Sequence, residues 1–147
     1  LSPAHAETVY RMAVNGAYAD GNDAVMSNHR DVFPYVAYHA IHDDRARPNH
    51  IALESLGLNG TNIYRVDDPV IQTFRPPWDY NCRCGRTFLT ISDAAASGVK
   101  EAQEWRDSGV PPKKPARVKW PKFRPPPGFV NDSLVPDSSR RHPGSQR

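Results

Sequence analysis

The proline-rich, basic last quarter of the chain is the feature that most constrains how this sequence can fold. Of the 15 prolines, 9 follow Val110, and the same 37 residues carry 9 Lys and Arg but only 2 Asp and Glu. Such a segment buries too little apolar surface to fold alone and favours an extended, polyproline-like backbone. We therefore divide the chain into a folded unit, residues 1–110, and an extended basic tail, residues 111–147.

The folded unit has the opposite charge. Residues 1–110 carry 10 Lys and Arg against 14 Asp and Glu, a net charge of −4, whereas the tail carries +7. The sequence pI of about 9.0 therefore describes the tail. Only 38% of residues are hydrophobic, and the mean hydropathy is −0.68, which predicts a small core.

The sequence gives no sign of a membrane segment. No apolar run approaches the roughly 20 residues that span a bilayer. The first residues lack the charged head and apolar stretch of a secretory signal. We therefore expect no membrane partner. Because the chain begins with Leu rather than Met, we also expect it to be part of a longer protein with a domain upstream.

The first 27 residues show the pattern of a helix. Ser2 is a suitable N-cap, and Pro3 suits the first helical position. Apolar residues between Ala6 and Ala17 recur at helical spacing, which predicts that this side of the helix packs into the core. We expect Gly21 to end the helix and Asp23 to cap a short second one.

The middle of the chain predicts a small sheet connected by short helices. We expect strands at residues 35–42, 62–66 and 82–91, the first of them covered on both faces. Short helices are expected at Pro48 and over residues 67–74, and a final helix from a Ser92-Asp93 cap to about Gly109. The fold class is therefore α+β: an N-terminal helical segment, then a short antiparallel or mixed sheet with short helices, then the extended tail.

Aromatic residues make the first half of the tail more than a spacer. Trp120, Phe123 and Phe129 lie between its prolines. We expect the stretch up to about Val130 to lie along a surface, either that of its own folded unit or that of a neighbouring subunit.

Two polar clusters lie at predicted strand ends and carry the candidate chemistry. Two thiolates and an imidazole are good zinc ligands, and Asp43 or His42 would complete the set. Cys82 and Cys84 are two residues apart along the predicted strand, so both side chains point to the same face. A zinc ion would also help a poorly cored domain to fold. The clusters comprise Asp43, Asp44, Arg45, Arg47 and His50, and then Asn81, Cys82, Arg83 and Cys84.

A metal-free interpretation stays open beside the zinc site. Cys82 and Cys84 are then small buried strand residues, and His50 hydrogen-bonds a carboxylate such as Asp43. A disulfide between residues two apart is strained, so we expect reduced thiols in a cytosolic setting.

The arginines of the two clusters admit two interpretations. Arg45 and Arg47 have carboxylates next to them, which favours a local ion-pair clasp that also includes Asn81 and Arg83. The alternative is phosphate binding by a guanidinium fork. Tail cations are candidates for contact with DNA phosphates, with strong salt dependence. These are Lys113, Lys114, Arg117, Lys119, Lys122 and Arg124.

No catalytic set is evident in the sequence. A Cys–His nucleophile pair is conceivable, but neither the zinc-deaminase pattern nor a phosphate-binding glycine loop is present. We therefore expect no enzymatic activity and no catalytic residues. The alternative is a metal-assisted nuclease or toxin-like effector, which needs an open ligand position on a metal beside a cleft.

A series of spaced elements runs through the middle of the chain: Asp43, Arg45, Arg47, Pro48 and His50, then Asp67-Asp68-Pro69, Pro76-Pro77 and Asn81-Cys82-Arg83-Cys84. Together these elements resemble the Mu F-like phage head morphogenesis family of minor capsid proteins. The resemblance covers roughly residues 3–95, with weaker similarity to about residue 132, where the segment PPGFVND occupies the place of the family's glycine-phenylalanine element. The loop after His50 is longer than the family pattern, so Gly57 or Gly60 takes the expected glycine position.

The resemblance implies a structural minor head protein of a tailed bacteriophage. It implies a few copies in each virion, assembled in the host bacterial cytoplasm and placed near the portal. It further implies partners among portal, coat or scaffolding proteins and a part in head assembly, DNA packaging or ejection. A DNA-binding virion module that acts through the basic tail is the second hypothesis.

Overall fold

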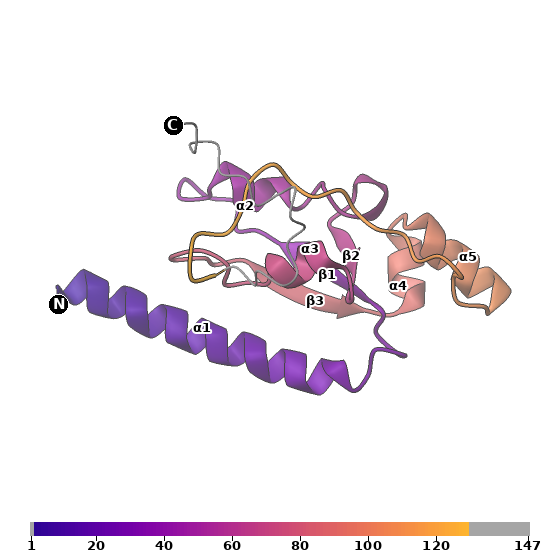
Figure 1. Ribbon diagram of the computed structural model, residues 1–147, viewed down its shortest axis with the longest axis horizontal. Helices are drawn as coiled ribbons and strands as arrows, with labels where there is room; N and C mark the ends of the chain where they lie inside the picture. Colours follow the sequence, from indigo (N-terminus) through magenta and orange to yellow (C-terminus); the bar gives the residue numbers. More distant parts are fainter. Residues whose placement is uncertain (1, 130–147) are drawn as a thin grey trace, which may run out of the picture.

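A three-stranded antiparallel sheet forms the centre of the structure, a computed structural model that describes residues 2–129 (Figure 1). Its strands are β1 (Tyr35–His39), β2 (Ile63–Arg65) and β3 (Gly85–Leu89), in the order β2-β1-β3. Val36 of β1 pairs with Tyr64 on one side and with Phe88 on the other. The α+β class is confirmed, and the sheet is antiparallel.

The central strand β1 is covered on both faces, as its mixed pattern predicts. Tyr35 to Tyr38 are all buried. Val36 and Tyr38 belong to a core cluster with α3 (Pro69–Thr73) and Trp78. Tyr35 and Ala37 belong to a second cluster with α4 (Ile91–Ala96) and α5 (Lys100–Ser108).

The N-terminal helix α1 (Pro3–Ser27) begins as predicted, because the Ser2 side chain accepts from the backbone N–H of His5. It then continues through Gly21 and Asp23, so the predicted break there is wrong. The predicted packing of its apolar side is also wrong, because no residue of α1 is buried. Its exposed large apolar residues are Val9, Tyr10, Val14, Tyr18 and Val25.

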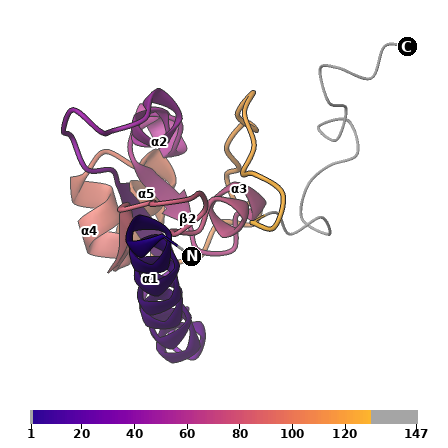
Figure 2. The same cartoon turned by 90° about the vertical axis from the view of Figure 1, so that its left-hand side faces the viewer.

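The opposite side of α1 lies against the body. Thr8, Met12, Ala19 and Met26 are half-buried there, and Asp20 and Asp23 pair with arginines of the body. Figures 1 and 2 show α1 as a long rod beside the sheet. Charge pairing, and not the apolar stripe, therefore decides which side of the helix faces inward.

The short helices follow local signals closely. α2 (Pro48–Ala52) and α3 each begin with a proline, and the Asp68 carboxylate caps α3 by accepting from Val70 N–H. A short 3-10 turn, η1 (Leu58–Gly60), precedes β2. The predicted last helix is two helices, since Gly98 at φ +95° separates α4 from α5. Its cap is Thr90, in a capping box with Asp93, and not Ser92.

The third strand is shorter than predicted and begins after the cysteines. Asn81 takes a left-handed conformation, at φ 54°, and β3 starts only at Gly85. Cys82 and Cys84 therefore lie in the connecting loop. Their common direction comes from this loop and not from strand alternation.

The tail runs along its own folded unit as far as the structure describes it. Val118, Trp120 and Phe123 pack against the core clusters, and Phe123 lies 5.5 Å from Phe74 between ring centroids. Figure 2 shows this stretch, in orange, beside α3. The remaining tail, with the last part of PPGFVND, lies outside the described residues. Between residues 2 and 129, none of the helices has the length and apolarity needed to cross a membrane.

Candidate metal centre

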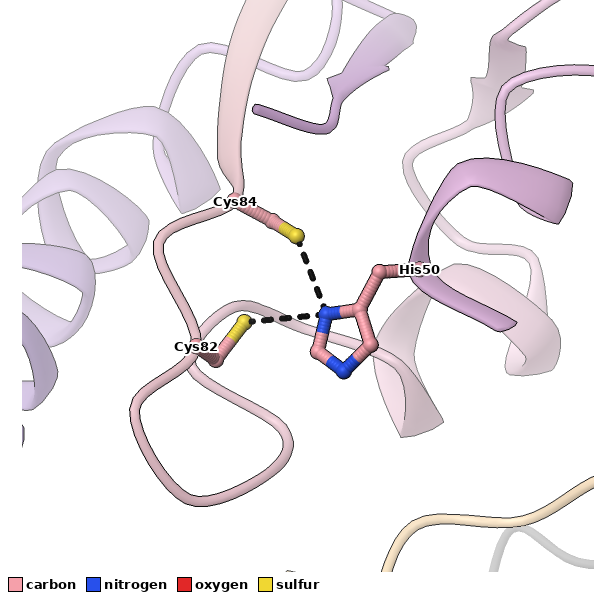
Figure 3. Close-up of side chains that lie close together, drawn as sticks. All are labelled: His50, Cys82 and Cys84. Atoms are coloured by element: carbon pink, nitrogen blue, oxygen red, sulfur yellow. Dashed lines mark hydrogen bonds between the residues drawn. The ribbon is translucent and has the colours of Figure 1, made fainter. Parts of the chain in front are cut away.

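Three of the four predicted metal ligands meet in one cluster. His50 Nδ1 lies 3.2 Å from Cys84 Sγ and 3.7 Å from Cys82 Sγ. All three donor atoms lie within 4.8 Å of one another. Figure 3 shows that one nitrogen of the imidazole points at both sulfur atoms. This set of donors comes from α2 and from the loop before β3, segments more than thirty residues apart.

Packing fixes the ring of His50. The side chain of His50 is 6% exposed. Its imidazole stacks on Trp78, with ring centroids 4.0 Å apart and an angle of 19° between the planes. Trp78 in turn donates from Nε1 to the Tyr38 hydroxyl at 3.1 Å. The ring orientation is thus set by the core, and the position of Nδ1 with it.

Backbone geometry fixes the two thiols. Cys82 N–H donates to the Asp79 carbonyl at 3.1 Å, which closes a tight turn over the left-handed Asn81. Cys84 directly precedes Gly85, which pairs with His39 of β1. The turn and the strand register together bring both sulfur atoms to the same side.

The two thiols shift each other's pKa in opposite directions. A hydrogen bond from Cys84 lowers the pKa of Cys82, although burial acts the other way. The hydrogen bond with Cys82, and then burial, raise the pKa of Cys84. A cation bound between the two sulfur atoms would favour the thiolate form of both residues.

The second nitrogen of His50 faces a carboxylate that sequence reasoning did not select. His50 Nε2 lies 3.6 Å from Asp79 Oδ2. Arg47 holds the same oxygen at 2.8 Å and also donates to the Tyr80 carbonyl at 2.6 Å. Asp79 lies three residues before Cys82, and this closeness in sequence to the cysteines could have marked it as a residue of the site. Its neighbour Trp78, which stacks on His50, was missed in the same segment.

Asp43, the fourth predicted ligand, is engaged elsewhere. Its carboxylate accepts two hydrogen bonds from Arg83, at 2.6 and 2.8 Å, which lower the pKa of Asp43 to about 2. His42, the other candidate, pairs with Glu54. The structure therefore does not bring either residue to the cluster, and the carboxylate near His50 is Asp79 and not Asp43.

The predicted clasp residues surround the cluster as ion pairs and turns. Arg45 donates its backbone N–H to Asp43 at 3.0 Å, and Arg47 and Arg83 pair with Asp79 and Asp43. A hollow of about 20 Å³ lies beside His50 and Cys84. Two larger hollows, of about 380 and 510 Å³, lie between α1 and the loop that carries Cys82.

The tail cations are placed in two ways. Arg117 pairs with Asp67 at 3.2 Å, and Arg124 is half-buried. The four lysines are exposed: Lys113, Lys114, Lys119 and Lys122.

Comparison with known proteins identifies the relatives of this chain. The family model of phage Mu protein F-like proteins matches residues 1–87, which include all three clustered donors. The chain is 37% identical over 99 residues to the capsid assembly protein F of Escherichia phage Mu. It is 35% identical over 99 residues to the Mu-like prophage FluMu F protein of Haemophilus influenzae.

Both alignments cover 67% of this chain but only 21% and 22% of the relatives. The chain thus spans about a fifth of the length of these proteins. No solved structure matches it.

Proposed function

The chain belongs to the family of phage Mu protein F-like proteins, and from this membership we propose that it is a structural component in the assembly of a phage head. The observation that carries the proposal is its 37% identity to a capsid assembly protein. Such a component acts by binding other head proteins and needs no chemistry of its own. We place it in the virion, in few copies near the portal, where it contributes to DNA packaging or ejection.

The exposed side of α1 is the surface we assign to this binding. Five large apolar side chains lie along it, each between 48% and 73% exposed. Several large apolar side chains exposed on one long helix are typical of a protein–protein contact. The helix sits on the body through its other side, and these side chains remain exposed among residues 2–129. The partner we propose is the portal protein.

Charged substitutions among these side chains test the proposal. In phage that carries the full-length protein, Val14→Asp combined with Tyr18→Asp should reduce its amount in purified proheads about tenfold or more, since burying two charges opposes binding. Quantitative mass spectrometry of the proheads measures this.

Arg11→Gln, which changes an exposed polar residue of the same helix, is the matched control and should leave incorporation unchanged. Circular dichroism verifies that the helix persists. Equal incorporation of the double variant would contradict the role of α1. Absence of the unaltered protein from proheads would contradict the virion function itself.

A second function, contact with packaged DNA, is favoured by the exposed lysines of the tail. Lys114 and Lys119 lie with Lys100 around an open hollow of about 620 Å³, although Glu101 and Glu104 line it too. Affinity for duplex DNA should fall steeply with salt and with removal of residues 111–147. Equal affinity of the two forms at low salt would exclude this function.

A further inference from the structure

We propose that His50, Cys82 and Cys84 bind a zinc ion, through Nδ1 and the two sulfur atoms, with a solvent molecule in the fourth position. The ion would join α2 to the loop before β3. This proposal is independent of the function in head assembly, because it rests on the chemistry of the donors alone.

The spacing of the donors fits zinc. With Zn–S of about 2.3 Å and Zn–N of about 2.0 Å, tetrahedral geometry places sulfur and nitrogen ligands roughly 3.5 Å apart. The two observed separations, 3.2 and 3.7 Å, lie on either side of that value. Thiolate and imidazole donors also select zinc over magnesium or calcium, which prefer oxygen.

Both thiols point at the same nitrogen of His50, and this arrangement favours a bound metal ion over hydrogen bonds. A neutral imidazole nitrogen has one lone pair and accepts one good hydrogen bond. Here both sulfur atoms converge on Nδ1 (Figure 3), and His50 and Cys82 are buried while Cys84 is half-buried. A cation at their centre satisfies all three atoms at once, because each of them supplies a lone pair to it.

The far side of the imidazole is also arranged as it is in zinc sites. A zinc-bound histidine commonly donates its other ring N–H to a carboxylate, which orients the ring and increases its basicity. His50 Nε2 has no hydrogen-bond partner within ordinary distance, and Asp79 Oδ2 is the carboxylate that faces it at 3.6 Å. Asp79 is thus a positioning residue for the metal ligand.

The fourth position follows from the remaining space. Asp43 is held by Arg83, and the hollow of about 20 Å³ beside His50 and Cys84 has room for a single water molecule. Solvent therefore completes the coordination.

Metal analysis of the purified, reduced full chain tests the proposal. We expect about one zinc per chain by elemental analysis, and a thiolate-to-cobalt charge-transfer band when Co²⁺ replaces zinc. Cys82→Ser and Cys84→Ser should each abolish tight binding. Asp43→Asn is the matched control, an acidic residue of the same region that should keep the zinc. Asp79→Asn should still bind one ion but with about 10- to 100-fold lower affinity.

Measurements on the wild-type chain test the proposal even if a cysteine variant fails to fold. Chelation of its zinc should lower Tm, and readdition should restore it. A folded, reduced chain that takes up no zinc at micromolar free metal, and gives no charge-transfer band with Co²⁺, would overturn the proposal. Retention of zinc by both cysteine variants would overturn the assignment of the ligands.

Discussion

Glu101 lies where β1, β2, α5 and the tail meet. One of its oxygens accepts from the Tyr35 hydroxyl at 2.8 Å and from Arg65 at 2.7 Å. The other accepts from the backbone N–H of Ala116. Both side chains of the Arg65–Glu101 pair are largely buried, at 12% and 10% exposed. Burial and the bond to Glu101 raise the pKa of Tyr35, so this tyrosine stays neutral.

Removal of this carboxylate should destabilise the whole domain. Glu101→Ala removes the acceptor of the Tyr35 hydroxyl and one of the two carboxylate partners of Arg65, which keeps Asp67 at 3.2 Å. We expect a loss of about 2–3 kcal/mol in the free energy of unfolding. Urea denaturation measures it. Glu104→Ala, one turn away and exposed, should change stability by no more than about 0.5 kcal/mol. Similar losses in the two variants would contradict this role of Glu101.

At the scale of elements, α1 depends on a few charged contacts. Asp23 pairs with Arg75 at 2.7 Å and also with Arg86. Burial lowers the pKa of Arg86, so this arginine gains most from a nearby carboxylate. The helix otherwise touches the body through half-buried residues and leaves hollows beneath it. We infer that α1 is the element most easily released from the domain.

Asp23→Ala should release α1 and leave the sheet intact. We expect a loss of about 1–3 kcal/mol, because Arg86 is left without a partner in a place of little exposure. Hydrogen exchange should quicken in α1 and stay unchanged in β1. Asp20→Ala removes a 65% exposed partner of Arg75 and should cost no more than about 1 kcal/mol. Unchanged exchange in α1 of the Asp23 variant would show that other contacts hold the helix.

At the scale of the whole molecule, the tail is part of the folded structure. Arg117 pairs with Asp67, and the N–H of Val118 donates to the Asp68 carboxylate at 3.2 Å. Phe123 then stacks over Trp78, with ring centroids 6.3 Å apart. A segment that cannot fold alone thus gains order from a surface formed by the first 110 residues.

The pKa of Asp67 reports whether the tail is docked. Burial raises this pKa, but the pairs with Arg117 and Arg65 lower it more, so the net shift is downward. Arg117→Gln should therefore raise the pKa of Asp67, as measured by carboxyl NMR. An unchanged pKa would contradict docking at this place.

The sign of the pH effect follows from this direction. A lowered folded-state pKa contributes stability above the unfolded value, near 3.8, and that contribution is lost as pH falls through the folded pKa. The wild type should thus be more stable to unfolding than Arg117→Gln at neutral pH, and this difference in the free energy of unfolding should disappear below about pH 4. Because Asp67 is 38% exposed, the advantage should not exceed about 1 kcal/mol.

The sequence by itself determined the features that depend on near neighbours. Ser2 and Pro3 mark the start of α1, the mixed faces of residues 35–38 mark a strand covered on both sides, and Asp68 with Pro69 marks α3. The approach of His50 to the two cysteines was predicted from donor chemistry, but the expected strand-end placement is not what produces it. His50 lies on α2 and the cysteines lie in the loop before β3. Caps, turns and alternation act within a few residues, so the sequence carries them directly.

Only the tertiary structure decided between two arrangements that the local sequence allows almost equally well. The apolar side of α1 predicted burial, but the pairing of Asp23 with Arg86, 63 residues away, turns that side outward. Asp43 and Asp79 were both available to His50, and the bidentate pair with Arg83 removes Asp43. The tail was equally suited to its own surface or to another until Asp67 and Asp68 supplied its contacts. In each case the deciding partner lies far away in sequence, where no local pattern records it.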